Sequence, residues 1–203
     1  SHRGGRPGFV RIDADRTLAS EDGQCFDLGE RQLQFIHTPG HANHHGCIFD
    51  KQSGNLFTGD TFGLGYRELV TDTPLLLATT TPVAFDPDAW MTSLDRLLAL
   101  TPKAVCLTHY GRYPHPAELA PMLRHNIEAH VRIALVEEER DSDGREQRLL
   151  DAVATLLVEA AGTHCGIDSR EAKKLLGHDI ALNAQGLQVW LTRRQKARDR
   201  TRS

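Results

Sequence analysis

The sequence predicts an α/β domain followed by a helical subdomain, and two patterns within its 203 residues support this. Between residues 9 and 109, short apolar runs of strand length alternate with turn segments that contain Gly, Asp or Pro. After Pro116 these runs disappear, and apolar residues recur three and four positions apart. We therefore expect residues 1–115 to form the α/β domain and residues 116–203 to form a helical extension.

The first strands are expected in hairpins. The run FVRID at residues 9–13 is strand-like. In CFDLGERQLQFIH, at residues 25–37, Gly29 and Glu30 are expected to form a tight turn between two strands. The segment GCIFDKQSGNLFTGD, at residues 46–60, has the same design, with a connection that contains Gly.

A long connection follows the hairpins, because residues 61–85 are rich in Thr, Gly and Pro. A loop of this length in a compact domain usually lines a functional site or is disordered. A helix is expected directly after it, since Asp86 can cap the first turn and Pro87 fits that turn. The run AVCL at residues 104–107 then predicts a short buried strand. The helix expected to begin at Asp86 and Pro87 has an apolar stripe made of Trp90, Leu94, Leu97 and Leu98.

The extension is expected to contain four helices. In the second of them, the apolar residues follow the spacing of one face of an α-helix. In the third, Asp168 and Glu171 are spaced as a capping pair. The four predicted segments are residues 117–140, 144–162, 168–179 and 181–195.

Composition excludes several classes of function. The net charge of −3 gives no reason to expect binding to nucleic acid, and we interpret the basic residues 192–203 as a solvated helix end. There is no apolar run of about 18 residues, so we expect no membrane span. The four cysteines lie far apart, which is typical of buried thiols in a reducing compartment, and the cytoplasm is the expected location. Composition leaves the oligomeric state open, and a homodimer is possible.

Three polar residues each follow a predicted strand, beside a glycine. His41 follows TPG, Asp60 ends TGD, and His109 lies in LTHYG. In layered α/β proteins the carboxyl ends of strands are where sites are built, and Gly allows the backbone to bend and a ligand to approach. Two imidazoles and a carboxylate suit zinc, manganese or iron. The order and placement of the three residues therefore predict a metal site.

The motifs TPGHANHHGCIFD, LFTGD and LTHYG resemble the C-terminal half of the metallo-β-lactamase fold, in its glyoxalase II-like hydrolase branch. The resemblance runs from Phe9 to Gly111. It implies an αββα sandwich that is present only in part here, with a site at one edge that usually holds two metals. The cofactor it implies is a divalent metal, two zinc ions in the first instance, with manganese or iron as alternatives.

The resemblance also implies a role for each ligand. His41 matches the histidine that binds the first metal, Asp60 matches the aspartate that bridges both metals, and His109 matches the histidine that binds the second. His45 matches a histidine that is normally not a ligand. For His45, and for the nearby His37 and His44, we expect hydrogen bonding to neighbouring loops or orientation of a ligand.

The sequence departs from the family pattern at one point. The family's His-x-His-x-Asp-His motif, which lies N-terminal to the other motifs, has no match here. Without it each metal keeps two protein ligands, below the three expected of a catalytic zinc site. The sandwich would also lack most of one sheet, which leaves an exposed apolar face and unpaired strand edges. We therefore expect the chain to be the C-terminal portion of a longer hydrolase.

These features favour a metal-dependent hydrolase acting on a small ester, thioester, lactone or similar substrate. A metal-bound water would provide hydroxide near neutral pH, with Asp60 as the catalytic bridging ligand. Tyr66 and Arg67 follow Asp60 and either shape the substrate pocket or pack within the loop. One alternative is an iron-dependent dioxygenase of the persulfide type. A second is a non-catalytic fragment that binds a partner through its helices.

Overall fold

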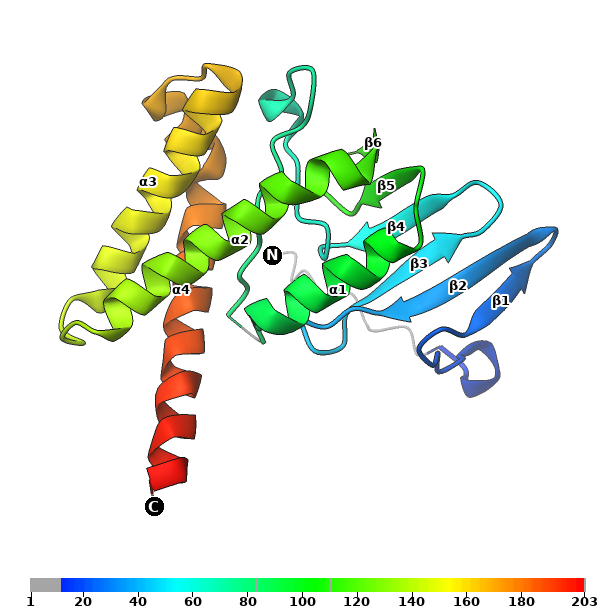
Figure 1. The fold of residues 1–203 in the computed structure, drawn as a ribbon, viewed down its shortest axis with the longest axis horizontal. Coiled ribbons are helices and arrows are strands. Elements are labelled where there is room, and N and C mark those ends of the chain that lie inside the picture. Colours follow the sequence, from blue (N-terminus) through cyan, green and yellow to red (C-terminus); the bar gives the residue numbers. More distant parts are fainter. Residues whose placement is uncertain (1–11, 83, 110, 203) are drawn as a thin grey trace, which may run out of the picture.

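The computed structural model describes residues 12–82, 84–109 and 111–202 of the chain (Figure 1). In this part, six strands form one mixed sheet in sequential order, and four α-helices follow or flank it. Neighbouring strands are antiparallel except for β4 and β5, which are parallel. The strands are β1 (Cys25–Leu28), β2 (Arg31–His37), β3 (Gly46–Asp50), β4 (Asn55–Gly59), β5 (Ala104–Leu107) and β6 (Arg112–Pro114).

Most of the predicted strands are confirmed. Gly29 and Glu30 form the turn between β1 and β2, and residues 51–54 form the turn between β3 and β4. The strand predicted at residues 9–13 falls largely outside the described residues. The short strand β6 was not predicted, because three exposed or half-buried residues that end in Pro carry no clear strand signal and fit only the edge of a sheet.

The two faces of the sheet differ in what covers them. On one face, where α1 (Pro87–Ala99) lies across the strands, side chains of four neighbouring strands are almost completely buried (Figure 1). On the other face, the cross-strand neighbours Ile48 and Phe57 are 41% and 46% exposed. The exposed apolar face expected of a partial sandwich is therefore present. The buried residues on the face that α1 covers are Ile36, Cys47, Leu56 and Val105.

Helix α1 begins as its sequence predicts. The side chain of Asp86 accepts a hydrogen bond from the backbone N–H of Ala89 at 3.1 Å, and Pro87 occupies the first turn. Trp90, Leu94 and Leu97 are fully buried, and Leu98 is partly buried. The apolar stripe thus packs the helix against the covered face of the sheet.

The helical extension contains three helices instead of the four that were predicted. They are α2 (Pro116–Glu138), α3 (Arg145–Cys165) and α4 (Ser169–Arg202). Asp168 caps α4 by accepting hydrogen bonds from the backbone N–H groups of Arg170 and Glu171. Within the described ranges, no helix has the length and apolar character needed to cross a membrane.

The predicted break near residue 180 was wrong because packing overrides local propensity. Gly177 lies inside α4, where glycine costs about 1 kcal/mol relative to alanine. It is exposed, and the residues on either side continue a buried stripe along the helix. The helix therefore runs on without a break. The stripe consists of Leu176, Ile180, Ala184, Leu187 and Leu191.

The described residues of the long connection between β4 and α1, which are 61–82, 84 and 85, are mostly buried, and this burial favours a packed connection over a disordered one. A 3-10 turn at Arg67–Leu69 lies within it, and the connection runs between the sheet and the helical extension (Figure 1). Residues 61–65 and 74–80 are buried. The hydroxyl of Tyr66 donates a hydrogen bond to Oδ2 of Asp179 in α4 at 2.7 Å. This bond attaches the first part of the connection to α4.

Two buried asparagines attach the end of this connection to the helices. Asn126 of α2 accepts a hydrogen bond from the N–H of Ala78 through Oδ1 at 2.8 Å. Asn183 of α4 accepts from the N–H of Thr80 at 2.8 Å and donates from Nδ2 to the carbonyl of Ala78 at 3.0 Å. These bonds satisfy backbone groups that would otherwise be buried without a partner.

His130 of α2 completes this polar cluster. Its Nδ1 donates to the carbonyl of Asn126 at 2.8 Å, and its Nε2 faces Nδ2 of Asn183 at 3.4 Å. The ring is fully buried, and burial lowers its pKa from 6.5 to about 4. A neutral ring is what the cluster requires, because the amide of Asn183 donates to its bare Nε2.

We predict that His130 makes the protein less stable as the pH falls from 6.5 to 4. In this window the unfolded chain binds a proton at this residue and the folded chain does not, so stability rises with pH. A pKa shift from 6.5 to about 4 corresponds to roughly 3 kcal/mol in the free energy of unfolding. Urea unfolding measured across this window should give a shallower pH slope for His130→Gln than for the wild type.

His125→Gln is a matched control, because it removes an exposed imidazole from the same helix. An equal pH slope in the wild type and His130→Gln would contradict the prediction.

Candidate metal centre

The three residues predicted as ligands meet at one edge of the sheet. Strands β2, β4 and β5 run in the same direction, because β2 and β4 are both antiparallel to β3, and β4 and β5 are parallel. Their carboxyl ends therefore lie at the same edge. His41 comes four residues after β2, Asp60 directly follows β4, and His109 comes two residues after β5.

The carboxylate of Asp60 lies between the two imidazoles. Oδ2 is 3.4 Å from Nε2 of His41, and Oδ1 is 3.5 Å from Nε2 of His109. His41 is buried, whereas His109 is half-exposed. Each carboxylate oxygen thus faces a different ring nitrogen, as in a ligand that bridges two positions.

The orientation of His41 is fixed from its other nitrogen. Nδ1 lies 2.9 Å from the carbonyl oxygen of Thr79 and 2.8 Å from its hydroxyl. A carbonyl can only accept, so Nδ1 must carry the hydrogen. In the neutral ring Nε2 is then a bare lone pair. A hydrogen bond of this kind to the nitrogen opposite the metal is the usual support of a histidine ligand.

This arrangement leaves electron pairs facing one another. The lone pair of His41 Nε2 points toward the carboxylate, and Oδ1 of Asp60 is a buried atom without a hydrogen-bond partner. An unpaired buried carboxylate oxygen is unfavourable unless a cation satisfies it. Two ligands about 2.1 Å from one tetrahedral zinc lie roughly 3.4 Å apart, which matches both nitrogen–oxygen distances. The donor set therefore fits a divalent metal.

The ligand count is incomplete in the part of the chain that the structure describes. There, no group of three or more His, Cys, Asp or Glu side chains is placed to bind one ion. Each His–Asp60 pair supplies two donors, as the sequence indicated. A catalytic zinc site normally has three protein ligands.

His45 has a role that sequence reasoning did not resolve. Its Nε2 accepts a hydrogen bond from the backbone N–H of Asp60 at 2.9 Å. Its Nδ1 then carries the hydrogen and lies 3.0 Å from the hydroxyl of Thr38 and 2.8 Å from that of Thr61. Burial, with a smaller effect from His41, lowers the pKa of His45 and favours this neutral form. Both ring nitrogens are in use, so His45 positions Asp60.

The other two histidines of the cluster lie away from Asp60. Nε2 of His37 donates to the carbonyl of Asn43 at 2.7 Å, which ties the two ends of the loop together. His44 is exposed. For His37 we expected hydrogen bonding to neighbouring loops or orientation of a ligand, and the bond that the structure shows goes to the β2–β3 connection that directly follows it.

Helix α1 supports the site through Trp90. The indole Nε1 donates to the carbonyl of Thr61 at 2.6 Å, and the ring packs edge-on against His41 with centroids 5.9 Å apart. The backbone of Gly40, at φ +134°, lies so close that an added Cβ would be 2.3 Å from Cα of Trp90. This glycine allows the turn before His41 to contact the helix.

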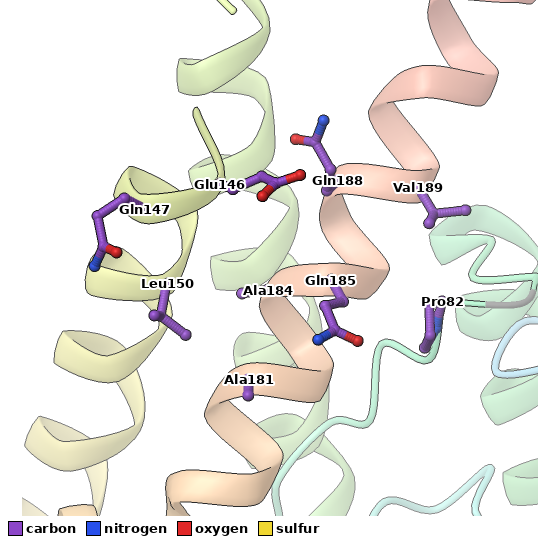
Figure 2. A pocket seen from close by; sticks show the side chains of 9 residues that line it. All are labelled: Pro82, Glu146, Gln147, Leu150, Ala181, Ala184, Gln185, Gln188 and Val189. Atoms are coloured by element: carbon purple, nitrogen blue, oxygen red, sulfur yellow. The ribbon is translucent and has the colours of Figure 1, made fainter. Parts of the chain in front are cut away.

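A separate pocket lies in the helical extension. Figure 2 shows it between α3 and α4, with Pro82 of the long connection at its side. It measures about 550 Å³, and its lining contains none of the three predicted ligands. The polar groups around it come mainly from side-chain amides. They belong to Gln147, Gln185 and Gln188, together with the carboxylate of Glu146.

A family comparison supports the assignment of the fold. The sequence model described as the metallo-beta-lactamase superfamily matches residues 3–109, which is more than half of the chain and includes all three candidate ligands. The chain belongs to the metallo-β-lactamase superfamily. The mixed sheet, its helices and the C-terminal helical region agree with this fold.

Two relatives illustrate the range of the superfamily. The chain is 36% identical over 101 residues to the metallo-beta-lactamase fold-containing protein ST1585 of Sulfurisphaera tokodaii. The matched region covers 50% of this chain and 35% of that protein. It is 46% identical over 58 residues to the acyl-coenzyme A thioesterase MBLAC2 of Homo sapiens. This match covers 28% of this chain and 21% of that protein. The matched region is therefore about a third or less of these relatives' lengths.

A solved structure gives the same result. The crystal structure of ST1585, described as an archaeal metallo-beta-lactamase superfamily protein, superposes with a TM-score of 0.51 at 27% sequence identity. The superposition covers 88% of this chain and 54% of the ST1585 chain. The similarity thus extends beyond residue 109 into the helical extension.

We predict that Gly59→Ala weakens metal binding at this site. Gly59 has φ +51°, and an added Cβ would lie 2.4 Å from Nε2 of His45, the atom that holds the backbone of Asp60. The left-handed backbone itself costs about 1–2 kcal/mol with alanine, and displacement of His45 adds to this. Zinc titration should show weaker binding by Gly59→Ala than by the wild type.

Gly29→Ala is the matched control. Gly29 has a similar φ of +59° but no atom within 4 Å of an added Cβ. Gly29→Ala should lower the free energy of unfolding through a similar backbone strain and leave the zinc affinity unchanged. Equal zinc affinities for the two variants would show that His45 does not position Asp60.

Proposed function

We propose that the protein is a metal-dependent hydrolase of the glyoxalase II-like branch, which uses a metal-activated water on a thioester or a related ester or lactone. The observation that carries this is the carboxylate of Asp60, whose two oxygens each face the Nε2 of a different histidine. In this proposal His41 and His109 would each hold one divalent metal, and Asp60 would offer one carboxylate oxygen to each. Zinc is the first candidate, because it suits imidazole and carboxylate donors.

The bound metals would lower the pKa of a water molecule, so that hydroxide is available near neutral pH. The chain's own residues prepare the site for this. Thr79 orients His41, His45 orients the backbone of Asp60, and Trp90 packs beside His41 at the buried side of the site. No side chain is required as a nucleophile in this scheme.

The proposal requires more ligands than the described residues supply. We propose that they come from a His-x-His-x-Asp-His motif in another part of the protein, and that this part packs against the exposed face of the sheet around Ile48 and Phe57. Two observations support this. Each candidate metal has two donors here, and the ST1585 chain is covered to only 54%.

A thioester is the substrate class we favour. The support is the 46% identity to MBLAC2, whose name describes an acyl-coenzyme A thioesterase. We propose the cytoplasm as the location, because all four cysteines are free and no pair forms a disulfide.

We predict that Asp60→Asn weakens zinc binding and abolishes thioester hydrolysis. Asparagine keeps the shape of the side chain but cannot offer an anionic oxygen to each metal. Zinc affinity, measured by titration with a competing chelator, should fall by at least about tenfold, and the protein with its further ligands present should no longer release free thiol from an acyl-coenzyme A. Asp27→Asn removes the same charge from an exposed strand and should change neither.

Unchanged zinc affinity in Asp60→Asn would contradict the ligand assignment. Iron as the tightly bound metal, together with oxygen uptake on a persulfide, would overturn the hydrolase in favour of the dioxygenase. Tight binding of two metals by this chain alone, as a folded monomer, would contradict the need for further ligands.

A further inference from the structure

The carbonyl of Thr79 sets the orientation of His41, so whatever holds the backbone at Thr79 also acts on the metal site. Thr79 lies in the long connection, 38 positions after His41 in the sequence. Such a segment does not by itself keep a carbonyl aimed at a ring nitrogen within hydrogen-bond distance. The contacts of its neighbours therefore matter.

The residues on both sides of Thr79 are bound by the helical extension. On one side, the N–H of Ala78 donates to Asn126 and its carbonyl accepts from Asn183. On the other side, the N–H of Thr80 donates to Asn183, and its hydroxyl donates to the carbonyl of the same residue at 3.0 Å. The carbonyl of Thr79 and the N–H of Thr80 belong to the same peptide group, so the bond to Asn183 limits the rotation of the group that carries this carbonyl. The bond to the carbonyl of Ala78 fixes the preceding peptide group.

Helix α4 reaches this segment because it has a glycine at the point of contact. Gly186 lies one turn after Asn183, on the same face of the helix. An added Cβ at Gly186 would lie 1.5 Å from the carbonyl oxygen of Thr80, which leaves no room for any side chain. Contact between the two backbones is what brings Asn183 within reach of Ala78 and Thr80.

We propose that the helical extension is a positioning element of the metal site. Asn126 and Asn183 hold the backbone on both sides of Thr79, and the carbonyl of Thr79 in turn holds His41 as the Nδ1–H tautomer with Nε2 free for a metal. The role of Nε2 as a ligand rests on the proposed function, but the tautomer does not. Asn126 and Asn183 act through Thr79 and contact no metal ligand themselves.

The tautomer can be measured without any metal. Long-range ¹H–¹⁵N spectra of the imidazole nitrogens distinguish the Nδ1–H form from the Nε2–H form at pH 8, where ordinary imidazoles are neutral. The wild-type chain should show His41 as Nδ1–H. In Asn183→Ala, freed peptides on both sides of Thr79 should allow a measurable Nε2–H population, and zinc affinity should fall by about tenfold or more.

Asn183→Asp provides a second variant that keeps the size of the side chain. Its carboxylate still accepts from the N–H of Thr80 but repels the carbonyl of Ala78, so the same changes are expected. Tyr66→Phe is the matched control, because it removes a different hydrogen bond between the same connection and α4. It should keep the wild-type tautomer and zinc affinity, even if urea unfolding shows a lower stability.

A folded Asn183 variant with His41 still entirely as Nδ1–H and with wild-type zinc affinity would overturn the proposal. A change in tautomer of equal size in Tyr66→Phe would also overturn it, because general loosening would then be the cause. If the protein with the further ligands present failed to bind a divalent metal, the proposed function would fail. The tautomer measurement would still decide whether α2 and α4 orient His41.

Discussion

The candidate site depends on one electrostatic constraint, which is that a carboxylate and two imidazole nitrogens meet at the end of three strands. Asp60 directs one oxygen to His41 and the other to His109. Two nearby hydrogen-bonded contacts support this arrangement. Thr79 occupies the far nitrogen of His41, and His45 holds the backbone of Asp60. In neutral His41 the lone pair of Nε2 faces the carboxylate, and a bound cation would relieve this repulsion.

Sequence reasoning singled out the three residues that meet at this site because their signal is local. His41, Asp60 and His109 each follow a strand, and strands that run in the same direction bring such residues to one edge. The hairpins and the start of α1 are equally local, since they depend on glycine turns and on the cap at Asp86. The density of histidines between residues 37 and 45 was less informative than the turn before His41, because only His41 faces the carboxylate.

The features that could not be predicted join residues far apart in the chain. His45 holds a peptide 15 positions away, and Asn183 holds Thr80 from 103 positions away. No periodicity or motif marks an asparagine as the partner of a distant backbone group. The continuity of α4 through Gly177 has the same origin, because the stripe that packs on α2 and α3 compensates for a residue that disfavours helix.

The long connection contacts α4 at three successive points. Tyr66 bonds to Asp179, Thr80 contacts Asn183 and Gly186, and Phe85 packs on Trp190 while its carbonyl accepts from Arg193. The fourteen-residue interval from 179 to 193 spans roughly 21 Å of helix. Inserting or deleting one residue within it would rotate every later contact by about 100°. Homologues that keep this site should therefore vary the length of α4 only outside this interval.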